Sequence, residues 1–210
     1  MKPLTIEEIE DARKCTAQAA TDLIGAAEAL LTAGYRAQSF FLAHAAVEEI
    51  AKIPMLVGVA LDIVAGRTVD WKEVGKRLES HHEKIQQTWI GLHINADEKI
   101  ADPELLAKAR KWFSADGAAR VLREHALYAG VVNLPGEPMS FKSPAEVIDQ
   151  TMAEEALAIA REIVTKRMQE EEISRGNLAR TPPGLVEAVE RHLEALLESS
   201  KATENMPNQA

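Results

Sequence analysis

The sequence predicts an all-α protein, an antiparallel helical bundle with a short extended or hairpin excursion near residues 129–143 and an extra C-terminal helix. Three observations predict this. Hydrophobic residues make up 46% of the 210 residues, and most are Ala and Leu, which lose little entropy in a helix. Apolar residues recur at helical spacing over long stretches. Short polar segments with cap and stop residues separate these stretches, which indicates neighbouring antiparallel helices.

In the first half of the chain, the apolar periodicity predicts three helices, over residues 5–33, 35–65 and 71–93. Thr5 and Glu8 form a capping box at the start of the first helix, because each side chain can satisfy a free backbone N–H group. Pro54 lacks an N–H group and should kink the second helix or end its first half. Asp70 is a suitable N-cap for the third helix.

The second half predicts three more helices, over residues 103–128, 143–175 and 183–199. The first of these has a weak point at Asp116-Gly117, and Pro135-Gly136 supplies the turn of the extended excursion. We expect a helical domain over residues 1–176, a helical appendage over 177–200 and a disordered tail over 201–210.

Composition narrows the class of protein. The net charge is −9, so the surface as a whole should repel nucleic acid. Residues 72–125, however, hold 10 Lys and Arg against 9 Asp and Glu, with four of the six histidines. Cys15 is the only cysteine, so we expect no internal disulfide and a cytoplasmic location. The sequence has no apolar stretch of roughly 20 residues, no zinc spacing and no Gly-rich phosphate loop, so we expect no membrane span, metal or cofactor.

Charged residues interrupt the otherwise apolar segment 35–52. His44, Glu48 and Lys52 lie four residues apart and share one stripe of a helix, and Glu49 reaches Lys52 at a spacing of three. Such charges are costly to bury alone, so we expect them to pair with each other or with another helix. Two interpretations stay open: a buried ion network that fixes helix packing, or part of an active or ligand-binding site.

Two further segments combine arginine with histidine. In the first, Arg77 lies four residues before His81 and five before His82, and His81 shares a face with Lys84. This segment is either a solvated charged face or a group suited to proton transfer at neutral pH.

The second such segment ends the predicted helix over 103–128. Arg120 and His125 are separated by four residues, as are Arg123 and Tyr128. A helix end with Arg, His and Tyr can hold a phosphate and move a proton, although this spacing is also common by chance.

Three segments in this order resemble the AbiV abortive-infection family, which belongs to the HEPN superfamily of helical bundles. The resemblance covers roughly residues 5–168. The first segment resembles a family helix in which small residues precede a Glu-Glu-x-x-Lys motif: Gly34, Tyr35, Ala43, Ala46, Glu48, Glu49 and Lys52. His81 to Lys84 resembles the family's His-x-x-Lys signature, and Arg123 to Tyr128, followed by Val131, resembles its arginine-to-tyrosine segment.

The resemblance implies phage defence by shutting down the infected cell. Many HEPN proteins are metal-independent ribonucleases that work as dimers, and their mark is an arginine followed by a histidine after four to six residues. Arg77 to His82 and Arg120 to His125 match this spacing. These nucleases often carry Asn, His or Asp two places after the arginine, where this chain has Glu79 or Leu122.

We therefore expect an endoribonuclease that acts on host or phage RNA and halts translation. Arg120 and His125 are the expected catalytic pair, with Tyr128 as an auxiliary phosphate ligand, and the alternative set is Arg77, His81 and His82. Two residues five apart on an unbroken helix lie about 140° apart, so the first pair needs an irregular helix or a second subunit to converge. We expect a buried network of His44, Glu48, Glu49, Lys52, His81 and Lys84.

Two expectations concern partners. The Ala-rich helix faces and the resemblance predict an isologous homodimer, the commonest closed symmetry. The alternative to a nuclease is a non-catalytic interaction module that binds a phage protein or a translation factor.

Overall fold

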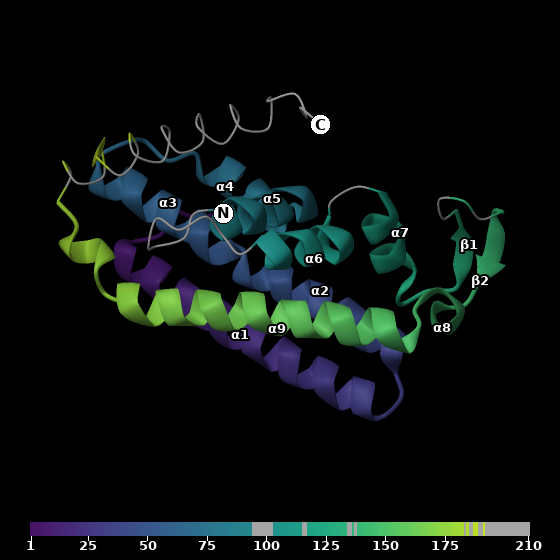
Figure 1. Cartoon of the computed structure of the whole chain (residues 1–210). Helices are drawn as coiled ribbons and strands as arrows, with labels where there is room; N and C mark the ends of the chain where they lie inside the picture. The colour runs from purple at the N-terminus through teal and green to yellow at the C-terminus, as the bar shows by residue number, and fades with distance from the viewer. Residues whose placement is uncertain are drawn as a thin grey trace, which may run out of the picture.

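A computed structural model of the chain describes residues 1–93, 103–114, 117–133, 136, 138–182, 184, 187, 188 and 191. The described part is an all-α bundle with one small sheet (Figure 1). The long helices α1 (Ile6–Thr32), α2 (Arg36–Ile50) and α9 (Gln150–Ser174) lie side by side, and α9 runs antiparallel to α1 (Figure 1). None of the described helices is long and apolar enough to cross a bilayer.

The predicted helix over residues 35–65 is divided in two. Helix α2 ends at Ile50, and α3 (Lys52–Val64) begins after a turn at Ala51. Pro54 has no N–H group to donate to the carbonyl of Ile50, four residues earlier, so the expected interruption falls one turn before the proline.

The prediction of one continuous helix over residues 71–93 is wrong. The structure has α4 (Trp71–Glu79) and α5 (His81–His93), separated by Ser80 in an extended conformation. The Ser80 hydroxyl accepts a hydrogen bond from the backbone N–H of Glu83, so Ser80 ends one helix and caps the next.

The prediction of one helix over residues 143–175 is wrong for the same reason. Helix α8 (Pro144–Val147) is a single turn, and α9 starts anew after Asp149, whose carboxylate accepts a hydrogen bond from the N–H of Met152. The predicted helix over 103–128 is also two helices, α6 (Pro103–Phe113) and α7 (Gly117–His125). The division falls at the weak point predicted from Asp116-Gly117.

The predicted excursion is a β-hairpin. Strands β1 (Gly130–Val132) and β2 (Ser140–Lys142) pair antiparallel, with Val131 directly opposite Phe141. After α9, a short 3-10 turn, η1 (Leu178–Arg180), follows. The predicted helix over 183–199 and the tail over 201–210 lie largely outside the described residues.

The Ala-rich faces lie inside the subunit. Six alanines on α1 and α2 are buried in the main core: Ala17, Ala20, Ala27, Ala37, Ala43 and Ala46. Their small side chains allow α1 and α2 to approach closely. A dimer therefore has to use a different surface from the alanine faces on which it was predicted.

A buried ion pair joins α1 to α9. Arg13 is 1% exposed and donates to the Glu171 carboxylate at 2.6 and 3.1 Å, to Ser174 Oγ at 2.9 Å and to Glu10 Oε2 at 3.1 Å. Buried charges need partners of this kind, so the contact fixes how the end of α9 lies on the start of α1.

Candidate functional site

The carboxylate of Glu48 is the centre of a charged cluster between three helices. It lies on α2 and is 9% exposed. His81 Nδ1 and Lys84 Nζ, both from α5, lie 2.5 and 3.2 Å from Glu48 Oε2, and Arg123 Nη1 from α7 lies 2.6 Å from Oε1. We call these four residues the Glu48 cluster. The lysine and arginine side chains are themselves nearly buried, so the cluster links α2, α5 and α7.

His81 differs from the other members of the Glu48 cluster in its exposure. It is the first residue of α5, directly after the break at Ser80, and its side chain is 63% exposed. The Glu48 carboxylate accepts a hydrogen bond from Nδ1 of His81. The neutral imidazole therefore has its free lone pair on Nε2. A carboxylate that holds one ring nitrogen of a largely exposed histidine is an arrangement suited to proton transfer.

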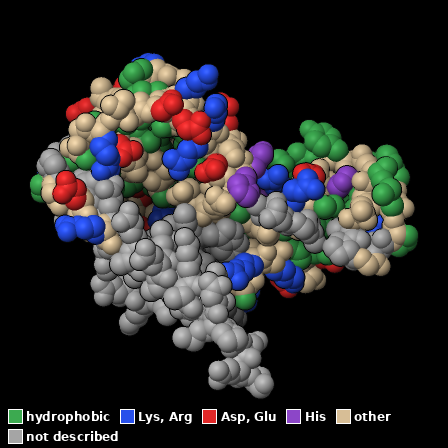
Figure 2. All heavy atoms as spheres, turned by 90° about the horizontal axis from the view of Figure 1, so that it is seen from above, with side chains coloured by type: hydrophobic (Ala, Val, Ile, Leu, Met, Phe, Trp, Pro, Cys, Tyr) green, Lys and Arg blue, Asp and Glu red, His purple; other side chains and the backbone are tan. Residues whose placement is uncertain are grey.

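The charge balance of the cluster is positive. One carboxylate, Glu48, faces the lysine and the arginine, so the cluster carries +1 with a neutral imidazole and +2 with a protonated one. Figure 2 shows histidine and basic side chains gathered on the face seen from above, between the main bundle and the hairpin end. This region can attract an anion although the whole chain carries a net charge of −9.

His44 lies one turn before Glu48 on α2 and is 2% exposed. Its ring packs between Phe40 and Phe113, with ring centroids 4.7 and 4.5 Å away. Neither ring nitrogen has a hydrogen-bond partner among the described residues. Burial, with a smaller contribution from the nearby Arg123 charge, lowers the pKa of His44 to about 3, so the imidazole is neutral at physiological pH.

Glu49 and Lys52 form a separate pair. Lys52 Nζ donates to Glu49 Oε2 at 2.6 Å, and both side chains are 26% exposed. The predicted six-residue network is thus divided, because the turn at Ala51 separates Lys52 from the stripe of α2. Glu48, His81 and Lys84 share one cluster, His44 packs beside it without a hydrogen bond among the described residues, and Glu49 pairs with Lys52.

The residues predicted as the catalytic pair lie on one continuous helix. Arg120 is exposed and its guanidinium donates to Glu124 at 2.7 Å, and His125 is the last residue of α7. The irregular backbone follows His125 instead of lying between the two residues, so within one subunit their side chains point about 140° apart. Tyr128, three residues further on, is exposed.

His125 packs against the start of the hairpin. A Cβ atom at Gly130 would lie 3.1 Å from Cε1 and 3.2 Å from Nδ1 of the His125 ring. The glycine therefore leaves the room in which the imidazole lies, and a larger residue would displace it.

The alternative set, Arg77, His81 and His82, is spread over two helices. Arg77, on α4, lies 3.6 Å from the Glu83 carboxylate, and the exposed His82 lies 2.9 Å from Gln86. The break at Ser80 separates Arg77 from both histidines. Of this set, His81 alone joins the Glu48 cluster.

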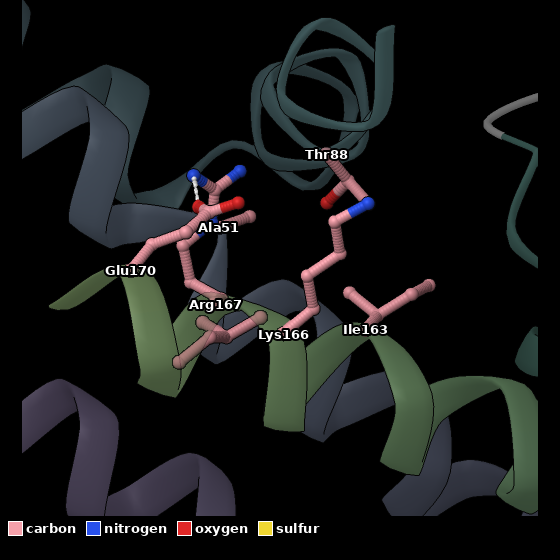
Figure 3. Close-up of a pocket in the computed structure, with 7 residues that line it drawn as sticks. Ala51, Thr88, Ile163, Lys166, Arg167 and Glu170 are labelled. Atoms are coloured by element: carbon pink, nitrogen blue, oxygen red, sulfur yellow. Dashed lines mark hydrogen bonds and ion pairs between the residues drawn. The ribbon is translucent and has the colours of Figure 1, made fainter. Parts of the chain in front are cut away.

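A small cavity lies at the junction of α2 and α3. It is lined by Ala51, by Thr88 of α5, and by Lys166, Arg167 and Glu170 of α9 (Figure 3). Lys166 points toward Thr88 in Figure 3, and the arginine pairs with the glutamate at 2.5 Å. A volume of about 10 Å³ holds at most one water, so this cavity is not a ligand site.

Sequence reasoning missed one member of the Glu48 cluster. In the sequence Arg123 stands out only by its spacing from Tyr128, whereas in the structure its guanidinium binds Glu48, which lies 75 positions earlier in the chain. The sequence marks Arg123 as part of the Arg123-to-Tyr128 segment that resembles the AbiV family. That segment does not show which residue the arginine contacts.

The helical bundle, in which Glu48 of the Glu-Glu-x-x-Lys motif binds the His-x-x-Lys motif at the start of α5, defines a domain of the HEPN class. The model of the AbiV family, HEPN_AbiV, matches residues 8–165, which are 158 of the 210 residues. The chain belongs to the AbiV family, and so to the HEPN-type abortive-infection defence proteins. No curated protein and no solved structure matches the chain.

Proposed function

We propose that this protein is an endoribonuclease that cleaves host or phage RNA during infection and thereby halts translation. The observation that carries the proposal is the exposed His81 imidazole, held by the buried Glu48 carboxylate beside two cations. Such a histidine can accept a proton, and the surplus positive charge favours an anionic substrate such as a phosphodiester.

The reaction needs a base and an acid. In the proposed step, His81 Nε2 takes the proton of an RNA 2′-hydroxyl, whose oxygen attacks the adjacent phosphorus. The bond from phosphorus to the 5′-oxygen breaks, and a second group protonates that oxygen. The products are a 2′,3′-cyclic phosphate and a 5′-hydroxyl end, and no metal takes part in this step.

His125 is the proposed proton donor to the leaving oxygen. It lies two residues after Arg123, whose contact with Glu48 fastens α7 beside α5. Arg120 and Tyr128 are the proposed phosphate ligands, because both are exposed near this end of α7. Convergence of Arg120 with His125 requires a second subunit, since the helix between these two residues is unbroken.

The test is cleavage of defined RNA by purified protein in the presence of EDTA, with the new ends identified chemically. We expect His81→Ala to lower the rate by about 10²–10⁴-fold, which is typical for loss of an acid–base group. His82→Ala is the matched control, because this exposed neighbour contacts Gln86 and not Glu48. Equal rates for the two variants would show that His81 does not transfer the proton.

The roles proposed for His125 as proton donor and for Arg120 as phosphate ligand are tested in the same assay with His125→Ala and Arg120→Ala. If both folded variants stay as active as the parent, the role of this helix end is refuted. If the parent cleaves no RNA in any condition, the protein acts instead as an interaction module that binds a phage protein or a translation factor.

A further inference from the structure

The hairpin end of the molecule exposes a patch of large apolar side chains. Seven large hydrophobic residues are exposed within the described part of the chain, and four of them lie here: Tyr128, Val131, Met139 and Phe141. Figure 2 shows hydrophobic side chains at the surface of this end. We call these four residues the hairpin patch. Clustered exposure of this kind marks an interaction surface, whereas single exposed apolar residues are ordinary.

The two faces of the hairpin have different environments. Val132 is buried and packs in the main core. Val131 and Phe141 lie directly opposite each other on the other face, and Phe141 is 72% exposed. One face of the sheet therefore carries the buried Val132, and the other carries the apolar pair of Val131 and Phe141, which the described residues of this subunit leave exposed.

Strand β2 also presents an edge. Within the described residues it pairs with β1 alone, and β1 is the strand that contacts α7. Figure 1 accordingly shows β2 as the outer strand. A two-stranded sheet is marginal by itself, and an open edge beside an apolar face is a template for another strand.

We propose that two copies of this chain associate through their hairpins, with β2 pairing antiparallel to β2 of the partner subunit to form one four-stranded sheet. A two-fold axis at Phe141 sets the register. Phe141 then faces its own copy, and Ser140 faces Lys142 of the partner subunit. This register brings no like charges directly opposite each other, and it continues the apolar face across the axis.

The size of the hairpin patch sets the expected affinity. An aromatic side chain has about 150–250 Å² of surface, and Tyr128 and Phe141 are each about seven-tenths exposed. With Val131 and Met139 added, the exposed apolar surface of the patch is on the order of 400 Å² per copy. Two copies bury about twice that, to which strand pairing adds, and this lies near the lower end of specific interfaces. We therefore expect a dimer that dissociates in the micromolar range.

The chemistry of the patch favours a protein surface over RNA. Single-stranded RNA binds through stacked aromatic rings and basic side chains together, whereas half of this patch is aliphatic and none of its four residues is charged. Phe, Tyr and Met are instead enriched at protein interfaces. A second copy fits in particular because the strand edge and the apolar face are both self-complementary.

The experiment measures mass by analytical ultracentrifugation across the micromolar range. The wild-type chain should approach twice 23.0 kDa, and Phe141→Glu, which puts two carboxylates at the axis, should stay at 23.0 kDa with an unchanged helical circular dichroism spectrum. Ile173→Glu is the control, because Ile173 is as exposed as Phe141 but lies at the far end of α9 (Figure 1). It should dimerise like the wild type.

A cross-link tests the register. Cys15 is the only cysteine, so a Cys15→Ser/Phe141→Cys protein should form a disulfide-linked dimer on mild oxidation, and Cys15→Ser/Ile173→Cys should not. A wild-type chain that stays monomeric throughout would refute the proposal, as would a Phe141→Glu dimer or failure of the Phe141→Cys cross-link. The inference does not depend on RNA cleavage, because every readout here is mass or covalent linkage.

Discussion

Protonation of His44 should make the fold acid-sensitive. The imidazole lies between Phe40 and Phe113, close to the Arg123 charge, and neither ring nitrogen has a hydrogen-bond partner among the described residues. A proton on this ring would place an unpaired charge in the core. In the unfolded chain the same ring is hydrated and takes up the proton at its ordinary pKa of 6.5.

The sign and size of the effect follow from the two pKa values. The folded-state pKa of His44 is about 3, below the unfolded value of 6.5. Between these limits the unfolded state binds the proton and the folded state does not, so the free energy of unfolding falls as the pH falls. The slope approaches about 1.4 kcal/mol per pH unit, and its integral between pH 7 and pH 5 is about 2 kcal/mol. More than about one pH unit above 6.5 the contribution of His44 is constant, because the imidazole is then neutral in both states.

The substitution His44→Leu isolates the contribution of His44 to the pH dependence of the free energy of unfolding. Urea unfolding at pH 7 and pH 5, at one protein concentration, gives the loss of stability over the interval for each protein. We expect the wild type to lose about 2 kcal/mol more than His44→Leu, whatever their offset at pH 7, because all other groups titrate alike. His82→Leu is the control, since this exposed histidine should leave the wild-type pH dependence unchanged. Equal losses in the wild type and His44→Leu would refute the reasoning.

Two buried carboxylates give the remaining stability predictions. Glu171→Gln removes the buried carboxylate closest to the Arg13 guanidinium and leaves it only the partly exposed Glu10 carboxylate among the described residues, so it should lower the free energy of unfolding by about 3–5 kcal/mol. Arg161→Met breaks an exposed pair and should cost less than about 1 kcal/mol. Glu48→Gln leaves two nearly buried cations unpaired and should cost a similar 3–5 kcal/mol, against less than about 1 kcal/mol for Glu49→Gln. Urea unfolding at pH 7 measures all four, and costs below about 1 kcal/mol for either buried carboxylate would contradict its assigned role.

Helical periodicity predicted the fold class and most helices, but it did not find every break. An apolar stripe shows which residues face the core, and this stripe continues across Ser80 and Asp149. Both residues are N-caps whose oxygens accept backbone hydrogen bonds, so each starts a new helix within the pattern. Serine and aspartate also occur inside helices, and the choice between these roles depends on tertiary packing.

The sequence predicted those parts of the site that lie on a single helix, because helical spacing shows which residues share a face. The four-residue spacing put His44 and Glu48 on one stripe, whereas the eight-residue step to Lys52 assumed a helix that in fact turns at Ala51. Arg13 shows a signal that was available: it lies four residues after Ile9 and four before Ala17, on the buried face of α1. Its partner Glu171 lies 158 positions away, and no local pattern gives such a pairing.

The structural and functional interpretations of the charged stripe are compatible, because one carboxylate serves both. Glu48 holds α5 and α7 against α2 and also orients His81, so a change at Glu48 alters stability and any proton transfer together. A change at His81 separates the effect on stability from the effect on proton transfer. In His81→Gln the side-chain amide can still donate to Glu48 but cannot transfer a proton at neutral pH. If the cluster is only structural, this variant keeps both stability and cellular toxicity. If it is also catalytic, stability stays and toxicity falls with the rate of RNA cleavage.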